Sequence, residues 1–286
     1  MKRFLQKTIL FFSLPAVLLA AVFVISSIRV SQKINEIAKD YDCLIMGDSQ
    51  IQRINPEYFK CKTFNFGSSG EHYYFTYSKL KKLLSARTCN IKIIVLGVSV
   101  HNFAPVYQRM VDLNCKEGKS SLERYFYFCN FFDGGIFTFG KCITHKDFLK
   151  GLTRKPDWNG FLESANKNPA KKDIERVLEI HYKVDTKIDY SKQEYYLGQI
   201  IRLCKKKNIK LLALSTPIHS YYKSHIPDIY FKNFNDIMKK KAELPHLNFL
   251  NVDISSNYMS DGNHLNKDGA RIYSKLVSEE VEKLLK

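Results

Sequence analysis

Residues 42–50 read Asp-Cys-Leu-Ile-Met-Gly-Asp-Ser-Gln, a short apolar run that ends at a glycine followed by polar residues. Four apolar residues in succession, at 43–46, are typical of a strand buried on both faces of a parallel sheet. Gly47 permits the sharp turn that has to follow such a strand. The segment therefore predicts a first buried strand with Asp48 and Ser49 at its carboxyl end.

The same pattern of short apolar runs and helical segments continues along the chain. Strands are expected at 43–46, 63–66, 91–96, 210–215 and 247–252, and helices at 71–86, 191–206, 228–242 and 267–285. Ser191 and Glu194 stand at capping-box spacing at the start of one helix. Strand–helix alternation predicts an α/β fold with a mainly parallel sheet and helices on both faces.

Polar segments follow the predicted strands at the sheet edge where ligands bind in such folds. They are Asp48-Ser49, Gly67 to Gly70, Ser99 to Asn102 and Thr216 to His219. Residues 103–190 interrupt the alternation and are rich in aromatic side chains, as in Tyr125-Phe-Tyr-Phe128. We interpret them as an insertion over the active-site edge; the aromatic residues serve packing or, alternatively, substrate stacking.

A carboxylate and an imidazole stand three residues apart near the C-terminus, in Asp261-Gly-Asn-His264. A serine hydroxyl becomes nucleophilic when an imidazole takes its proton and a carboxylate fixes the imidazole tautomer. Ser49, Asp261 and His264 are therefore the candidate catalytic residues, against the plainer reading of a turn serine, a loop cap and a surface histidine. His72 and His101 lie near predicted strand ends, where a lone histidine is more often structural.

These residues resemble the signature blocks of the SGNH (GDSL-type) hydrolase superfamily. Gly47-Asp48-Ser49 resembles the first block and Asp261-x-x-His264 the last, within an Asp-x-x-His-Leu-Asn-x-x-Gly string. Gly67 resembles the glycine block. The resemblance covers about 42–102 and 208–286, and it implies a flavodoxin-like three-layer α/β/α domain that hydrolyses esters or transfers acyl groups.

The resemblance also implies a role for each matched residue. Ser49 would be the nucleophile, His264 the base and Asp261 its orienting partner, while the N–H groups of Ser49 and Gly67 form part of the oxyanion hole. The family's third block, Gly-x-Asn-Asp, is not matched, because Ser99 stands where its asparagine is expected. We expect Asn102, or alternatively Ser99, to supply the oxyanion-hole donor that this asparagine would have provided.

The N-terminus carries no charge from residue 8 to residue 28, with Lys2, Arg3 and Lys7 before this run. A helix of that length spans a bilayer, and preceding basic residues keep the N-terminus in the cytoplasm. We predict a cytoplasmic tip and transmembrane anchor at 1–29 and an extracytoplasmic SGNH-like domain at 30–286 with the insertion at about 103–190. A cleaved signal peptide is the alternative.

Composition limits the partners. The net charge of +17 suits an anionic polymer or lipid surface, although solvated lysine-rich helix faces are the preferred explanation. No nucleic-acid-binding motif is present, so no nucleic-acid partner is expected. Seven cysteines without a C-x-x-C spacing disfavour a metal cluster. Three of them share the insertion, where a disulfide is conceivable: Cys115, Cys129 and Cys142.

The sequence predicts an extracytoplasmic esterase or O-acyltransferase that acts through an acyl-serine on a cell-surface polysaccharide or a related polymer. No metal or organic cofactor is implied. The membrane anchor and the altered third block also resemble the extracytoplasmic partners of membrane-bound O-acyltransferases. The alternative is a catalytically inactive scaffold subunit of a polysaccharide modification or export complex, which the altered third block favours and the intact Ser–Asp–His set disfavours.

Overall fold

The computed structural model describes residues 1–129, 131, 136–156, 158, 160–165, 168–182 and 189–286. Its centre is a parallel sheet of five strands in the order β2-β1-β3-β4-β5. The strands are β1 Cys43–Met46, β2 Thr63–Asn65, β3 Ile93–Gly97, β4 Lys210–Ser215 and β5 His246–Asn248. This is the strand order of flavodoxin-like folds, whose ligand site lies at the carboxyl ends of β1 and β3, where the order reverses.

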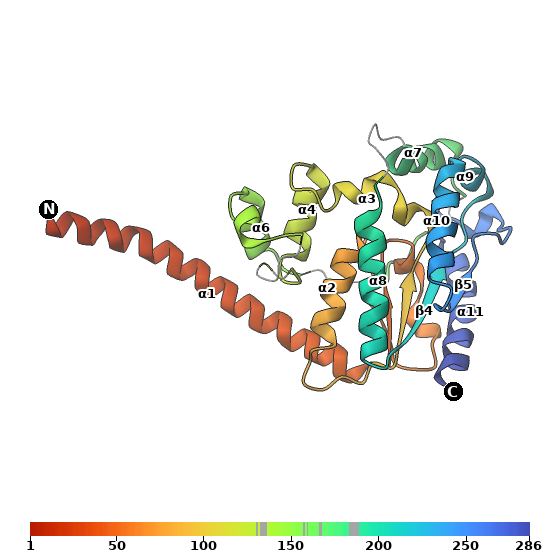
Figure 1. Cartoon of the computed structure of the whole chain (residues 1–286), viewed down its shortest axis with the longest axis horizontal. Coiled ribbons are helices and arrows are strands. Elements are labelled where there is room, and N and C mark those ends of the chain that lie inside the picture. The colour runs from red at the N-terminus through yellow and green to blue at the C-terminus, as the bar shows by residue number, and fades with distance from the viewer. Residues whose placement is uncertain (130, 132–135, 157, 159, 166–167, 183–188) are drawn as a thin grey trace.

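Helices cover both faces of the sheet (Figure 1). Leu44 and Met46 of β1 face a layer formed by the end of α1 with α2, α8 and α10, whereas Cys43 and Ile45 face α11. The bounds are α1 Lys2–Asp40, α2 Tyr73–Leu83, α8 Ser191–Lys206, α9 Ser220–Ser224, α10 Asp228–Lys240 and α11 Lys267–Leu285. Side chains that alternate along a strand reach opposite faces, so the apolar run at 43–46 is buried on both sides. The three-layer α/β/α prediction is confirmed.

Several predicted bounds shift by a few residues, and two further local predictions were wrong. The last strand ends at Asn248 rather than at 252, because Asn248 Oδ1 accepts a hydrogen bond from Leu250 N–H (3.0 Å) in a turn. The capping box of α8 does not form, since Ser191 is already helical and its N–H donates to Asp189 Oδ1 (3.0 Å). In both cases the side chain of a nearby Asn or Asp accepts the backbone N–H. The sequence pattern had predicted a strand hydrogen bond for Leu250 and a capping-box hydrogen bond for Ser191.

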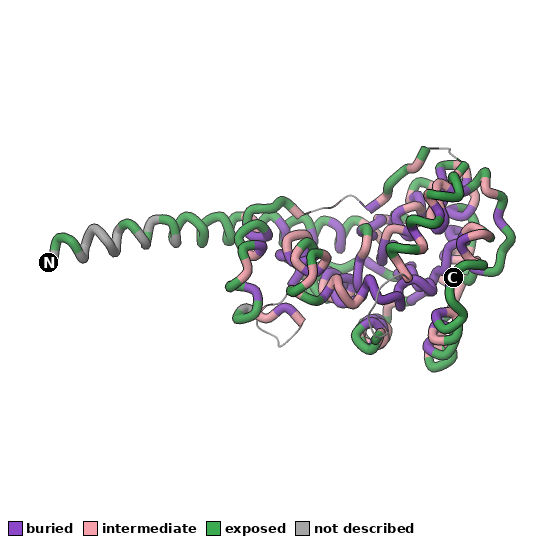
Figure 2. The backbone as a smooth tube through the Cα atoms, turned by 90° about the horizontal axis from the view of Figure 1, so that it is seen from above, coloured by how far each residue is buried: buried purple, intermediate pink, exposed green. Residues whose placement is uncertain are grey.

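The N-terminal helix α1 is continuous from Lys2 to Asp40, so the expected anchor and connector form one helix. Its stretch Val17–Asp40 is long and apolar enough to cross a membrane. The C-terminal part packs on the domain through Val30, Ile34 and Ile37, which are buried. The N-terminal part extends away from the rest of the chain and is largely exposed (Figure 2).

The segment 103–190 contains helices in two groups. They are α3 Pro105–Arg109, α4 Lys116–Tyr125, α5 Phe139–Cys142, α6 Lys146–Thr153 and α7 Lys171–Tyr182. α4 and α6 pack on each other, and α6 also contacts α1; α3 contacts α7, which in turn contacts α9. The aromatic run Tyr125–Phe128 is buried, and Tyr125 stacks on Phe75 with ring centroids 4.2 Å apart. These aromatic side chains therefore pack the core.

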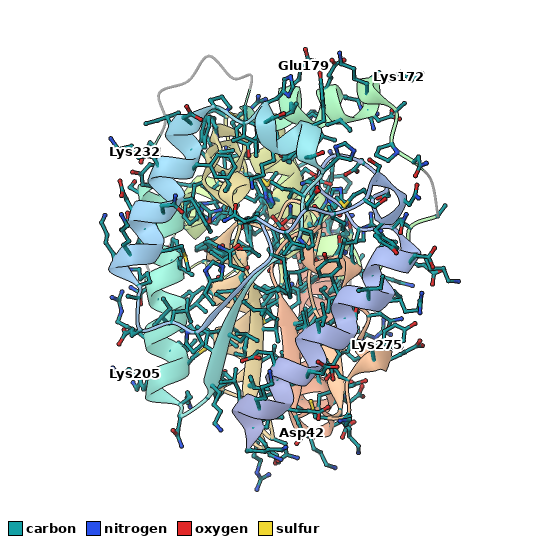
Figure 3. All side chains as sticks on the ribbon, turned by 90° about the vertical axis from the view of Figure 1, so that its right-hand side faces the viewer. Asp42, Lys172, Glu179, Lys205, Lys232 and Lys275 are labelled. Carbon is teal, nitrogen blue, oxygen red and sulfur yellow. The ribbon has the colours of Figure 1, made fainter. Side chains whose placement is uncertain are left out.

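Short 3₁₀ turns connect several elements, at Ile51–Arg53, Pro56–Tyr58, Val100–Phe103 and Ser256–Tyr258. All seven cysteines are free thiols, so the conceivable disulfide in the insertion is absent. The exposed lysines Lys205, Lys232 and Lys275 lie on three different helices around the domain (Figure 3). The positive charge is thus distributed over several helices.

Candidate active site

Ser49 lies at the carboxyl end of β1, directly after a turn that only glycine accommodates well. Gly47 has a φ of 130°, and a Cβ there would come within 3.2 Å of Gly97 N at the end of β3. Such a conformation is strained for L-residues with side chains, and the neighbouring strand leaves little room for one. The two glycines therefore let the chain turn tightly and present Ser49 above the sheet edge.

The structure brings Ser49, His264 and Asp261 together. His264 Nε2 lies 2.7 Å from Ser49 Oγ, and His264 Nδ1 lies 2.8 Å from Asp261 Oδ2. The loop before α11 makes the second contact possible, because Asp261 Oδ1 also accepts the backbone N–H of His264 (2.9 Å). Nucleophile, base and orienting carboxylate thus have the order and reach of a serine-hydrolase triad.

Asp261 is electrostatically suited to hold an imidazole. Burial raises the pKa of this carboxyl, but hydrogen bonds from His264 and from the N–H groups of Asn263 and His264, with the charge of His264, lower it to about 2. The carboxylate is therefore ionised at neutral pH and fixes the proton of His264 on Nδ1. Nε2 is left to accept the Ser49 proton.

The lowered pKa of Asp261 predicts a pH-dependent contribution to stability. A folded-state pKa of about 2, below the ordinary value of 3.8, stabilises the fold above about pH 4, and this stability is lost as the pH falls toward 2. The contribution is on the order of 2 kcal/mol. We expect the free energy of unfolding of the protein to fall relative to that of Asp261→Asn between about pH 5 and pH 2, measured by urea denaturation. A constant difference across this range would contradict the prediction.

Asp48, the residue before Ser49, is the centre of a second buried network. Its Oδ2 is 2.5 Å from His101 Nε2 and accepts hydrogen bonds from Asn102 Nδ2 (2.6 Å) and Tyr107 Oη (2.5 Å). Burial raises the pKa of Asp48, but the charge and hydrogen bond of His101, with hydrogen bonds from Tyr107 and the Gln50 N–H, hold it well below its usual range. This network ties the turn that carries Ser49 to the segment after β3.

The three predicted oxyanion donors differ in whether another group already accepts their hydrogen bond. No hydrogen bond engages the Ser49 N–H within the described part of the chain. The Gly67 N–H donates to Asn65 Oδ1 (2.9 Å). The Asn102 amide faces Asp48 through Nδ2, and its Oδ1 accepts from the Ser99 N–H (2.7 Å). Of the three predicted donors, Ser49 N–H is therefore the one that the structure leaves unengaged.

The plainer readings of the two lone histidines agree with their contacts. His72 caps α2, since its Nδ1 accepts the N–H of Tyr74 (3.0 Å). His101 Nε2 contacts the carboxylate of Asp48.

The segments that follow the other strands also meet at this edge of the sheet. Thr216 Oγ1 donates to Gln50 Oε1 (3.0 Å), and the His219 N–H donates to Gly262 O (3.0 Å).

Sequence reasoning missed His181 and Tyr222, which also surround the triad. His181 Nδ1 lies 2.6 Å from Tyr222 Oη. A Cβ at Gly262, inside the Asp261–His264 loop, would come within 2.6 Å of Tyr222 Cδ2, so the ring packs directly on that loop. The sequence signal for α7 is the helical spacing of Ile174 and Val177, which are both buried. It lies inside the segment 103–190, which we interpreted from the sequence as an insertion without assigning helices to it.

A cavity of about 620 Å³ lies away from the candidate active site. It is bounded by α1, α2, α8 and the chain after α4, and none of the candidate site residues lines it. In the ranges that the structure describes, no three His, Cys, Asp or Glu side chains gather as a metal site requires.

Comparison of the sequence with family models and with curated proteins finds no match. Among solved structures, a GDSL-like lipase from Bacteroides thetaiotaomicron is 13% identical, with a TM-score of 0.46 over 90% of this chain and 98% of the lipase. A provisionally named acylhydrolase from Bacteroides fragilis is 14% identical, with a TM-score of 0.45 over 90% and 96%. A provisionally named platelet activating factor from Streptococcus pneumonia is 11% identical, with a TM-score of 0.45 over 96% and 99%. Because these likenesses are distant, the chemistry is inferred from the geometry around Ser49.

Proposed function

We propose that this chain is an extracytoplasmic serine esterase or O-acyltransferase of the SGNH type, which removes or adds acyl groups, acetyl above all, on a cell-surface polysaccharide or a related polymer. The observation that carries the proposal is the contact of His264 Nε2 with Ser49 Oγ at 2.7 Å, with Asp261 on the other ring nitrogen at 2.8 Å. A turn serine and a surface histidine that merely cap loops have no reason to meet in this order.

The first half of the reaction transfers the acyl group to the enzyme. His264 Nε2 takes the proton of Ser49 Oγ as the oxygen attacks the ester carbonyl carbon. The carbonyl oxygen becomes an oxyanion, which the Ser49 N–H stabilises. When the tetrahedral intermediate collapses, the ester C–O bond breaks, and the proton on His264 passes to the departing alkoxide oxygen. The product is an acyl ester on Ser49 and a free alcohol.

The second half repeats these steps in reverse with a new acceptor. His264 removes a proton from water or from a sugar hydroxyl, and the resulting oxygen attacks the acyl-Ser49 carbonyl. Collapse releases the acid or the new ester, and Ser49 recovers its proton from His264. Asp261 remains ionised throughout and keeps the imidazole oriented.

The location and the substrate class rest on the N-terminal helix and the charge. α1 contains a stretch long and apolar enough to cross a membrane, and Lys2, Arg3 and Lys7 precede its apolar run. Under the positive-inside rule this distribution of charge supports an extracytoplasmic location for the residues after the span. The domain then works at the cell surface, and the net charge of +17 of the whole chain favours an anionic polymer. A membrane-bound O-acyltransferase is the partner that such an arrangement suits.

The test is acyl hydrolysis by the full chain in detergent micelles. We expect p-nitrophenyl acetate turnover and acetate release from an O-acetylated polysaccharide, both of which disappear in Ser49→Ala. Ser85→Ala, which changes an exposed serine outside the site, is the matched control and should keep both activities. Equal rates for the protein and Ser49→Ala on both substrates would contradict the proposal and favour a scaffold subunit.

A further inference from the structure

The candidate site has fewer oxyanion donors than its chemistry requires. The amide of Asn102 is turned to Asp48 (2.6 Å), and the Gly67 N–H is engaged by Asn65 Oδ1 (2.9 Å). That leaves the Ser49 N–H, whereas sites of this type use two or more donors directed at the oxyanion. A further donor has to come from a residue outside the predicted blocks.

His181 of α7 lies close enough to the triad to interact electrostatically with His264 and Asp261, and it is the candidate. Its ring stacks on that of His101, with centroids 5.2 Å apart and planes 27° apart, and His101 in turn contacts Asp48 beside Ser49. Tyr222 contacts the ring of His181 as well, because His181 Nδ1 lies 2.6 Å from Tyr222 Oη. Tyr222 in turn packs on Gly262, in the loop that carries Asp261 and His264. In Figure 3, Lys172 and Glu179 of the same helix lie at the end of the domain opposite Asp42, which precedes β1. α7 thus covers the carboxyl edge of the sheet.

The contact with Tyr222 bears on which ring nitrogen of His181 carries the proton. Tyr222 Oη lies 2.6 Å from Nδ1, and a Tyr222 O–H that donates there makes Nδ1 the acceptor. Burial, with the charges of His101 and His264, lowers the pKa of His181 to about 3, so the ring is neutral. With Tyr222 as the donor, the ring's one proton sits on Nε2, which forms no hydrogen bond with any described residue. In this tautomer His181 presents an unengaged N–H donor.

We propose that Tyr222 donates to His181 Nδ1 and that His181 Nε2–H in turn donates to the oxyanion that forms when Ser49 attacks an ester. The proposal rests on the proposed function, and it makes the insertion a part of the catalytic apparatus. Tyr222 is then a positioning residue, since it fixes the tautomer of His181 and does not touch the substrate.

Gln50 is the competing donor. Its Nε2 is buried without a hydrogen-bond partner, while its Oε1 accepts from Thr216 Oγ1 (3.0 Å). Gln50 is buried, whereas His181 is half-buried, and a donor to a bound substrate has to be reachable from the site. We therefore favour His181, and Gln50→Leu enters the test as the comparison.

The experiment measures p-nitrophenyl acetate hydrolysis by the full chain in detergent micelles. His181→Ala is expected to lower kcat about 100- to 1000-fold with KM nearly unchanged, because the lost donor acts only in the transition state. His181→Gln, whose amide offers a donor at similar reach, should recover about tenfold or more of this loss. The kcat of Tyr222→Phe should lie between that of His181→Ala and that of the unchanged protein. The kcat of Gln50→Leu should stay within about threefold of the unchanged protein.

A second readout separates an oxyanion donor from a structural residue. A trifluoromethyl ketone forms a hemiketal oxyanion on the active serine, so its inhibition constant should rise in His181→Ala by a factor that parallels the loss in kcat/KM. Ser49-dependent turnover that His181→Ala leaves within about threefold, or a loss that appears in Gln50→Leu instead, would overturn this inference alone. Absence of Ser49-dependent turnover in the unchanged protein would overturn the proposed function as well.

Discussion

Replacing Ser49 or His264 by alanine is expected to lower ester turnover about 10⁴- to 10⁶-fold, and replacing both should cost no more than the larger single loss. The two side chains meet through one hydrogen bond of 2.7 Å and act in one proton transfer, so removing either one removes the whole step. Steady-state rates with p-nitrophenyl acetate, measured at equal protein concentration, provide the comparison.

The double variant makes this prediction specific to a triad. Residues that act independently lose rate multiplicatively, whereas members of one catalytic unit do not. Losses that multiply in Ser49→Ala/His264→Ala, or a single variant that retains more than about a tenth of the rate, would show that the contact between Ser49 and His264 is not the reacting one.

Breaking the buried ion pair between Glu71 and Lys79 is expected to have the largest effect on stability, about 3–5 kcal/mol for Lys79→Met. The pair is 2.6 Å apart with both side chains almost fully buried. Lys79 Nζ also donates to Phe66 O and lies 4.0 Å from the centre of the Phe66 ring. Burial raises the pKa of Glu71, while Lys79 beside it acts in the opposite direction. A lone Glu71 would thus be an uncompensated buried charge next to the chain that leads to Gly67.

A double substitution tests whether the charge pairing is the cause. Glu71→Leu/Lys79→Met replaces both charges with apolar side chains and should recover a large part of the lost stability. Urea denaturation of the full chain in detergent micelles measures each free energy of unfolding. If the double variant is less stable than Lys79→Met, the packing of the two side chains and their hydrogen bonds to Thr76 and Phe66 outweigh the pairing, and the prediction is wrong.

The apolar runs in the sequence were sufficient to predict the sheet. Residues 43–46 and 210–215 form β1 and β4 with the predicted bounds, because the middle of a central parallel strand is apolar. Helices α8 and α11 also have the predicted bounds, 191–206 and 267–285. The end of the last strand at Asn248 depends on a single side-chain hydrogen bond, which periodicity does not report.

The site was predictable only where its residues stand in compact motifs. Ser49 follows a strand, and Asp261 and His264 lie three residues apart, so chemistry and spacing alone were enough to propose their contact. The contact of His181 with Tyr222 joins residues 41 positions apart in segments with no shared motif. Asn102 lay at the predicted sheet edge, but its direction toward Asp48 was set by the buried carboxylate, which requires several donors.

Covalent labelling of the full chain with a fluorophosphonate tests the proposed nucleophile most directly, because it needs neither the natural acyl group nor an acceptor. The reagent phosphonylates a serine whose proton an adjacent base removes, with loss of fluoride. We predict one adduct per chain, on the peptide that contains Ser49, and none in Ser49→Ala or His264→Ala. An unmodified Ser49 at full reagent excess, or labelling that persists in Ser49→Ala at the same rate, would contradict a catalytic role for this serine.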